Sequence, residues 1–290
     1  GYLAVLASPD NQVASDAHLY VKNISDTMYT PKSLVKLCKT VEIAQEVLIT
    51  DTTITVKDAS NITALTFLKI DNELMYITSI LGKVLTVKRA ILDTIPDHHT
   101  SDSKGLVFSK QNVLNNLYNN TNNIDVKVVT NAEGNLLSLP NTTTSNVVFD
   151  SRAIRPYPPA NVKINGEYWP AYFEDGFTLT WSNRNRLQQT QGDFIGYFES
   201  SVALEENTQT LLTVIELDAT DVELATHSVD VTASNSFTLL ESAMQADTRS
   251  LDINLKTVRE GYECMNVFDH IVKRSTLIAP RNVTFEVIEY

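Results

Sequence analysis

Hydrophobic and polar residues alternate with a period of two along most of the chain, and clusters of Asn, Asp, Ser, Thr and Gly separate the alternating segments. Alternation places one face of a strand in a core and the other in solvent. Short alternating segments bounded by turn residues are typical of antiparallel sandwiches and barrels. The pattern therefore predicts a mainly β protein. The clearest examples are Ile54 and Val56, Leu85 and Val87, Phe177 to Trp181, Val229 and Val231, Leu251 to Leu255, and Val283 to Val287.

Helical patterns are sparse. Residues 31–47 begin with Thr30 and Pro31, a possible N-cap and first helical residue, but their apolar positions fit neither the helical nor the strand period. Residues 112–118 have room for one or two helical turns. Neither segment changes the mainly β prediction.

The clearest domain boundary is the segment RAIRPYPP, residues 152–159, which holds three prolines in four positions. Proline fixes φ and removes a backbone donor, so this segment is unsuited to a central strand. We expect one β domain over residues 1–152 and a second over residues 153–275.

Residues 276–290 follow the second domain and contain a further alternating segment at Val283, Phe285 and Val287. This segment is predicted to be a strand. Two interpretations remain open: it pairs with a neighbouring subunit, or it opens a further domain.

Composition describes a globular protein, with 43% hydrophobic and 20% charged residues. The net charge of −12 argues against a nucleic-acid partner, which needs clustered Lys and Arg. No apolar run is long enough to predict a membrane span. The two cysteines, Cys38 and Cys264, lie far apart and are predicted to be buried thiols. With nine glycines and no phosphate-binding or redox motif, the sequence predicts no cofactor.

Two groups of short motifs follow one another along the chain. The first group, within residues 51–108, consists of Thr53 to Val56, Ile70 to Met75, Gly82, Leu85 to Arg89, Asp93-Thr94 and His98. The second consists of the RPYPP segment, Thr180 to Arg186 (TWSNRNR) and Arg259 to Gly261. In this order the motifs resemble those of tail-tip and tail-hub proteins of long-tailed bacteriophages and gene transfer agents. One departure is Ala90, where that family has Gly.

The resemblance implies an N-terminal antiparallel β domain followed by a fibronectin type III-like β-sandwich. It implies a structural component of the virion tail tip or baseplate, made in the cytoplasm of the bacterial host. Its partners would be other tail-tip proteins and further copies of itself, with a trimer favoured.

Asp71 and Glu73 are the strongest candidates for catalysis. They lie two apart on a predicted strand and so share one face, as the paired carboxylates of a tail-associated glycosidase would. The neighbouring residues, Met75 to Ile77, belong to an ordinary sheet and offer no sugar-binding cleft. The structural interpretation is favoured, and no catalytic residue is predicted.

His98 and His99 are the candidates for metal binding. Adjacent residues of an extended chain point to opposite sides, so the two rings cannot chelate one ion together. Asp93, Asp97 and Asp102 offer oxygen ligands, but their spacing is not that of an EF-hand. We expect a polar loop with one histidine hydrogen-bonded locally, and no metal site.

Arg184 and Arg186 are predicted to project from the strand face opposite Trp181. Arginine pairs of this kind bind the carboxylates of a partner protein. They bind equally well to the backbone or to acids within their own domain, such as Glu199 or Glu205. Both interpretations remain open.

Tyr168, Trp169, Tyr172 and Phe173 form the densest aromatic cluster. Such a cluster docks partner proteins or stacks on sugars, which would make the chain a host-recognition module that binds a surface glycan or protein. The alternative is packing against Tyr157. The candidate interface residues are thus Arg184, Arg186, Tyr168, Trp169, Tyr172, Val283, Phe285 and Val287.

Overall fold

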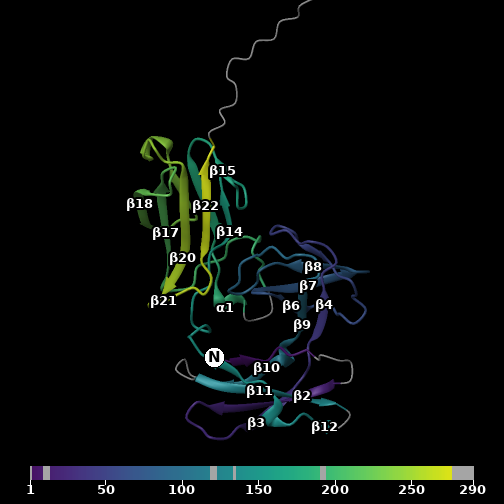
Figure 1. Ribbon diagram of the computed structural model, residues 1–290. Helices are drawn as coiled ribbons and strands as arrows, with labels where there is room; N and C mark the ends of the chain where they lie inside the picture. The colour runs from purple at the N-terminus through teal and green to yellow at the C-terminus, as the bar shows by residue number, and fades with distance from the viewer. Residues whose placement is uncertain (1, 9–13, 118–122, 133–134, 190–193, 276–290) are drawn as a thin grey trace, which may run out of the picture.

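The computed structural model describes residues 2–8, 14–117, 123–132, 135–189 and 194–275, and these residues form three β bodies along the chain (Figure 1). We name them the N-terminal sheet, the barrel and the sandwich. Helix is limited in this described part to α1 (Arg186–Gln189) and three 3-10 turns, η1 (Lys110–Asn112), η2 (Leu139–Asn141) and η3 (Glu241–Ala243). The predicted mainly β class is confirmed.

The N-terminal sheet joins strands that lie about a hundred residues apart in the chain. β2 pairs with β3 on one side and with β11 on the other, and β12 and β13 both pair with β11. β1 and β10 form a separate two-stranded sheet. The strands are β1 (Tyr2–Ala4), β2 (Ala14–Asn23), β3 (Thr30–Val35), β10 (Val113–Leu117), β11 (Asn123–Ala132), β12 (Asn135–Leu136) and β13 (Ser145–Val148).

The barrel is inserted between β3 and β10. Its strands are β4 (Lys39–Glu42), β5 (Thr53–Thr55), β6 (Thr66–Ile70), β7 (Glu73–Leu81), β8 (Val84–Lys88) and β9 (Lys104–Phe108), in the antiparallel order β4-β9-β6-β7-β8-β5. A bridge between Ile43 and Val56 joins the two edges and closes the sheet. Closure removes the unpaired edges that an open sheet of this kind would present.

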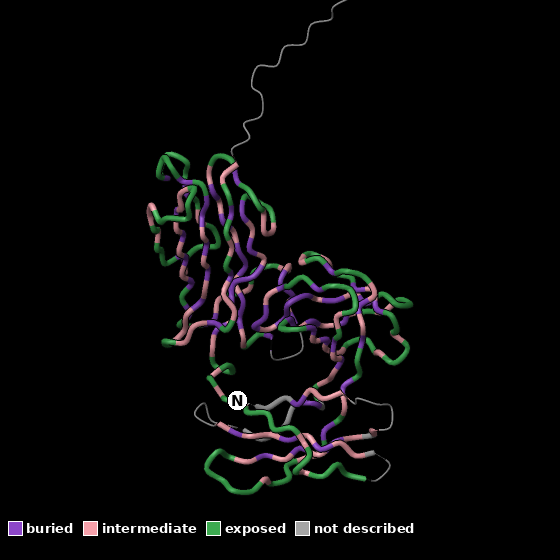
Figure 2. The backbone as a smooth tube through the Cα atoms, viewed as in Figure 1, coloured by how far each residue is buried: buried purple, intermediate pink, exposed green. Residues whose placement is uncertain are grey.

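Period-two alternation fills the barrel with aliphatic side chains. Met75 and Ile77 on β7 are fully buried, as are Leu68 and Ile70 on the paired β6. Figure 2 shows buried positions along the strands, interspersed with intermediate and exposed ones. The first 152 residues, which were expected to form one β domain, therefore hold two bodies with separate hydrophobic cores.

Both segments considered for helix contain strands, and no α-helix, in the described residues. Residues 30–35 form β3, residues 39–42 form β4 and residues 113–117 form β10. The physical reason is pairing: residues 39–42 complete the barrel by bonding to β9, and residues 113–117 bond to β1. Tertiary pairing overrides weak local preferences of this kind.

The sandwich consists of two facing sheets. One has the order β14-β16-β19 and the other the order β22-β20-β17-β18, with β15 and β21 as short additions. The strands are β14 (Ala160–Ile164), β15 (Tyr172–Phe173), β16 (Phe177–Ser182), β17 (Thr208–Leu217), β18 (Glu223–Asp230), β19 (Ser236–Leu239), β20 (Ser250–Arg259), β21 (Tyr262–Glu263) and β22 (Phe268–Arg274). This strand order, with buried Trp181 between the sheets, is that of a fibronectin type III-like sandwich.

The proline segment, residues 152–159, connects β13 to β14 without forming a strand. The cysteines are free and buried, Cys38 between β3 and β4 and Cys264 in the sandwich. Burial is the main cause that raises the pKa of each thiol. No helix in the part of the chain that the structure describes is long and apolar enough to cross a membrane.

Candidate functional site

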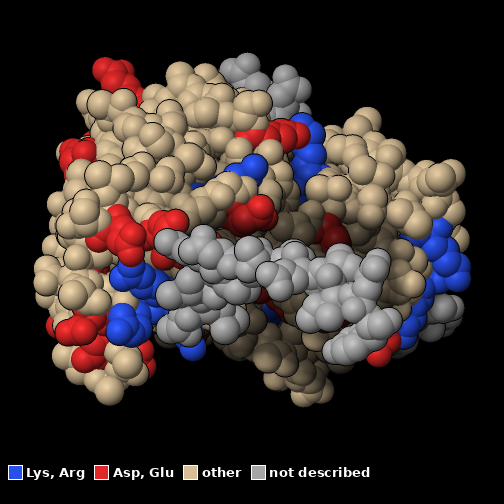
Figure 3. All heavy atoms as spheres, turned by 90° about the horizontal axis from the view of Figure 1, so that it is seen from above, with Lys and Arg blue, Asp and Glu red and all other residues tan. Residues whose placement is uncertain are grey.

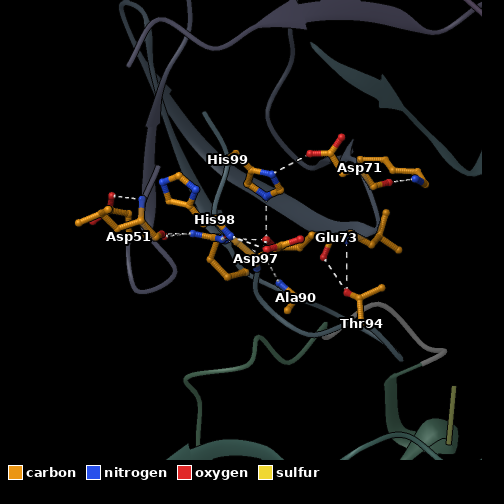
Figure 4. Close-up of polar contacts among 12 residues, drawn as sticks. Asp51, Asp71, Glu73, Ala90, Thr94, Asp97, His98 and His99 are labelled. Carbon is orange, nitrogen blue, oxygen red and sulfur yellow. Dashed lines mark hydrogen bonds and ion pairs between the residues drawn. The ribbon is translucent and has the colours of Figure 1, made fainter. Parts of the chain in front are cut away.

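The carboxylate of Glu73 lies at the centre of a buried charged network in the barrel (Figure 4). Glu73 opens β7 and is fully buried. Its Oε1 accepts hydrogen bonds from Arg89 Nε at 2.6 Å and from the Ala90 N–H at 3.0 Å. Its Oε2 contacts Arg89 Nη2 at 2.7 Å, the Asp97 N–H at 3.0 Å and His99 Nε2 at 2.9 Å. Both oxygens are thus fully engaged by donors from the chain.

Arg89 follows β8, and its guanidinium is engaged in the same way. Besides the two bonds to Glu73, Nη1 donates to the carbonyls of Leu48 at 2.9 Å and Asp51 at 2.8 Å. Nη2 also donates to the Asp97 carbonyl at 2.6 Å. All five N–H groups of the guanidinium are therefore used. A buried ion pair is tolerated when its remaining polar atoms are satisfied in this manner.

His99 closes the network from the opposite side. Its backbone exchanges two hydrogen bonds with Val47, and its side chain is buried. Ring Nε2 contacts Glu73, and Nδ1 lies 3.2 Å from Oδ2 of Asp71. A neutral imidazole has one N–H and one lone pair, so two carboxylate contacts are satisfied together only by the protonated ring.

The pKa values of the two central groups shift in opposite directions. Burial opposes ionisation of Glu73, but hydrogen bonds from Arg89 and His99 outweigh it and lower the pKa of the carboxyl. Burial likewise opposes the protonation of His99, but the hydrogen bond and negative charge of Glu73, together with Asp71, raise the pKa of the ring. Each group therefore favours the charged form of the other.

Asp71 does not lie on a strand beside Glu73, and this corrects the sequence-based expectation. It occupies the turn between β6 and β7 with a positive φ of 49°, a conformation that Asp tolerates in tight turns. Its exposed carboxylate approaches His99 from the turn, while Glu73 approaches from within the barrel (Figure 4). The two acids therefore contact different nitrogens of one imidazole ring.

The two adjacent histidines diverge, as the extended geometry predicted. His98 lies at the surface, where its Nε2 contacts Glu46 at 2.6 Å. Among the described residues no group of three or more His, Cys, Asp and Glu side chains is arranged to hold a metal ion. Asp93 and Asp102, considered as oxygen ligands, instead pair with Arg152 and Lys57.

Residues 89–99, which we call the junction loop, contact the sandwich with their outer side. The Arg89 carbonyl accepts a hydrogen bond from the Tyr197 N–H at 2.8 Å. Lys88 Nζ donates to the Phe194 carbonyl at 2.9 Å and pairs with Glu199 at 2.9 Å. The backbone of the barrel and the segment 194–200 of the sandwich are therefore directly joined.

The middle of the junction loop makes further contacts with the proline segment, residues 152–159, and with the sandwich. Arg152 binds the Asp93 carboxylate through two hydrogen bonds of 2.5 and 2.8 Å. Asn266 Nδ2 donates to the Asp93 carbonyl at 2.5 Å. Ala90 and Ile95 pack on the hydrophobic core of the sandwich. Ala90 stands where the resembled family has Gly, and it still adopts a positive φ of 45°.

Arg184 shapes the segment of the sandwich that meets the junction loop. Its side chain is buried, and burial lowers the pKa of the guanidinium to about 10. It donates to the carbonyl of its neighbour Asn183 and to several carbonyls of one loop, which are those of Gly196, Tyr197, Glu199 and Ser200. A planar guanidinium suits this multiple task because its donors point in fixed directions.

Arg186 is likewise paired within the chain, with Glu205 at 2.6 Å and the Ala153 carbonyl at 3.1 Å. Of the two interpretations of the arginine pair, the structure places both guanidinium groups on partners of their own chain. Arg186 binds the Glu205 carboxylate, and Arg184 binds backbone carbonyls, which include that of Glu199.

The aromatic cluster packs mainly against residues 197 and 198, which the sequence reasoning missed. Trp169 stacks on Tyr197 with ring centroids 5.5 Å apart, and Tyr168 meets Phe198 edge-on at 5.0 Å. Tyr172 is 65% exposed. The available signal was the aromatic run Phe194, Tyr197 and Phe198, which matches the cluster in density. The candidate interface residues Val283, Phe285 and Val287 lie outside the described residues.

Charged side chains on the face seen from above in Figure 3 are mixed, with Asp and Glu at several separate places and Lys and Arg between them. Between residues 160 and 275 the chain has eighteen Asp and Glu against eight Lys and Arg, so the sandwich carries most of the negative charge.

Comparison with known proteins gives no family assignment. No family model matches the chain, and no curated protein matches it. Among solved structures, a crystal structure of the FN1–FN3 domains of chicken CNTN1 aligns with 94% of this chain and 97% of its own, at 10% identity and a TM-score of 0.24. Because a TM-score this low carries no argument, the description of the sandwich rests on its own strand order.

Proposed function

We propose that this chain is a structural component of a bacteriophage tail tip or baseplate, located in the virion and acting through protein–protein contacts. The partners are other tail-tip proteins and further copies of the chain, with a trimer as the expected assembly. The proposal rests on the two groups of motifs that resemble tail-hub proteins.

One observation supports this proposal above the others: residues of both motif groups meet at one place. Glu73 and Arg89 of the first group hold the junction loop from inside the barrel. Arg184 of the second group holds the segment that docks on that loop. We call the contact between the junction loop and residues 194–200 the joint. Motifs that maintain this joint suit a building block whose barrel and sandwich must keep a fixed relative position within a larger assembly.

The glycosidase alternative receives less support from this geometry. A general acid needs a raised pKa and a free approach to substrate, whereas the pKa of Glu73 is lowered and both its oxygens are occupied. The carbohydrate-binding alternative loses its platform in part, because Trp169 faces Tyr197 rather than solvent.

The proposal is tested with antibodies raised against the purified chain. Immunogold labelling of phage particles from the source culture is expected to place gold at the tail tip. Light scattering on the purified chain is expected to give about three times the 32.3 kDa chain mass. Particles that lack the chain by immunoblotting, while it stays in the host lysate, would refute the proposed role.

A further inference from the structure

The junction loop is fastened at both of its ends by one carboxylate. Glu73 Oε1 accepts the Ala90 N–H at the beginning of the loop, and Oε2 accepts the Asp97 N–H near its end. His99, which follows directly, binds the same Oε2 and reaches Asp71 with its other nitrogen. Between these anchors the loop makes the contacts with the proline segment and the sandwich that are described above.

The two ring contacts of His99, which support this end of the loop, depend on a proton. With the ring protonated, Nε2 and Nδ1 both donate, and the charges of the four side chains balance: Arg89 and His99 against Glu73 and Asp71. After the proton is lost, one ring nitrogen presents a lone pair to a carboxylate oxygen, which is repulsive. The buried Glu73–Arg89 pair stays balanced, and the uncompensated negative charge is that of the exposed Asp71 carboxylate, which loses its favourable contact with the ring.

We propose that His99 is a protonation-controlled latch that sets how firmly the junction loop, and with it the sandwich, is held on the barrel. The latch is closed while the ring carries both protons. It opens as pH rises, and Asp71 is released first because its carboxylate is the exposed partner. Relaxation then spreads from His99 along residues 97–93 to the contacts with Arg152 and Asn266.

The charged groups around the ring come from every element that packs on it. Asp71 faces it from the β6–β7 turn, Glu73 from β7 and Arg89 from the end of β8. Other nearby charged groups are bound elsewhere: Lys69 to the Asp71 carbonyl, Asp51 to the Leu48 N–H, Asp97 to the His98 N–H, and Glu46 to the His98 ring. The His98 ring therefore contacts Glu46 at the surface and does not take part in the buried network.

Nuclear magnetic resonance on the labelled chain tests the latch between pH 6 and pH 9. Ring carbon and nitrogen shifts report the protonation of His99. The amide exchange of Tyr197, corrected for the intrinsic effect of pH, reports the joint because its N–H bonds to the Arg89 carbonyl. We expect His99 to be protonated at pH 6.5, and the protection of Tyr197 to fall about tenfold or more as the ring titrates.

Two substitutions make the assignment specific. Asp71→Asn alters an exposed side chain and should leave the fold intact. It should move two transitions to lower pH together, which are the titration of the His99 ring and the loss of Tyr197 protection. His98→Gln, a change at the adjacent surface histidine, should move neither. A neutral His99 ring at pH 6.5 would overturn the proposal, and so would constant protection of Tyr197 throughout the titration of His99.

Discussion

The Arg89 carbonyl accepts a hydrogen bond from the Tyr197 N–H at 2.8 Å, and this bond joins the barrel to the sandwich. In each body, a buried arginine network lies next to this bond. On the barrel side, the Arg89 guanidinium is buried against Glu73. On the sandwich side, the Tyr197 carbonyl accepts from Arg184 at 3.0 Å. One peptide-to-peptide hydrogen bond is therefore supported from both sides by a buried arginine.

Removal of the Glu73 carboxylate is expected to be severe. Glu73→Ala leaves the Arg89 guanidinium buried without its counter-charge, so the free energy of unfolding should fall by about 3–5 kcal/mol. Urea denaturation followed by circular dichroism measures this loss. Glu46→Ala removes an exposed acid of the same region and should change the free energy by less than about 1 kcal/mol. Equal losses in the two variants would contradict the structural role of Glu73.

Arg184→Lys keeps the charge but loses the planar set of donors. Because several carbonyls of residues 196–200 then lack their donor, we expect a loss of about 2–3 kcal/mol, with increased exchange confined first to that segment. Hydrogen exchange read by mass spectrometry locates the change. Arg274→Lys, whose partner Glu241 is exposed, is the matched control. Protection of residues 196–200 that matches the wild type would refute this prediction.

Gly196 lies close to the end of β8, where the sandwich meets the barrel. An added Cβ would meet Lys88 Cβ at 3.2 Å and the Arg89 carbonyl oxygen at 3.3 Å. Gly196→Ala should therefore strain the joint by about 1–3 kcal/mol. Gly176→Ala is the control, because its Cβ would come no closer than 3.5 Å to any atom. Limited proteolysis should cut the Gly196 variant faster between the two bodies, and equal cleavage of both variants would contradict the close contact.

Acid should weaken the network through Glu73. The pKa of this carboxyl is lowered in the folded state, so its stabilising contribution is fully present above the ordinary value of about 4.5. The contribution is lost as pH falls through the lower, folded-state pKa. Denaturation curves between pH 2 and pH 6 should show a decline that is smaller in Glu73→Gln, which cannot ionise. A decline of the same size in both proteins would assign acid sensitivity to other carboxyls.

Trp169 and Tyr172 belong to the same aromatic cluster but should respond differently to truncation. Trp169→Ala removes a ring stacked on Tyr197 and should cost about 3 kcal/mol. Tyr172→Ala removes a ring that is 65% exposed and should cost less than about 1 kcal/mol. Thermal unfolding distinguishes the two. A glycan array with the same variants tests the carbohydrate-binding alternative, which requires that both lose binding.

Alternation along the sequence was sufficient to predict strands because it depends only on residues next to one another. Met75 and Ile77 show this directly, since their spacing alone predicts a shared buried face. The same rule failed for Asp71, because a two-residue turn interrupts the strand just before Glu73. Turn positions depend on pairing between β6 and β7, which local spacing does not reveal.

By itself, the sequence determined the mainly β class, the proline-marked connection before the sandwich, the buried thiols and the divergence of the two histidines. Only the tertiary structure decided that β2 pairs with β11, that the barrel is inserted between them, and that Glu73, Arg89 and His99 share one network. Strand type follows from the local order of side chains. Strand pairing and the charge state of buried groups follow from contacts between distant residues. These contacts decide whether the free-energy cost of desolvating a polar group is offset.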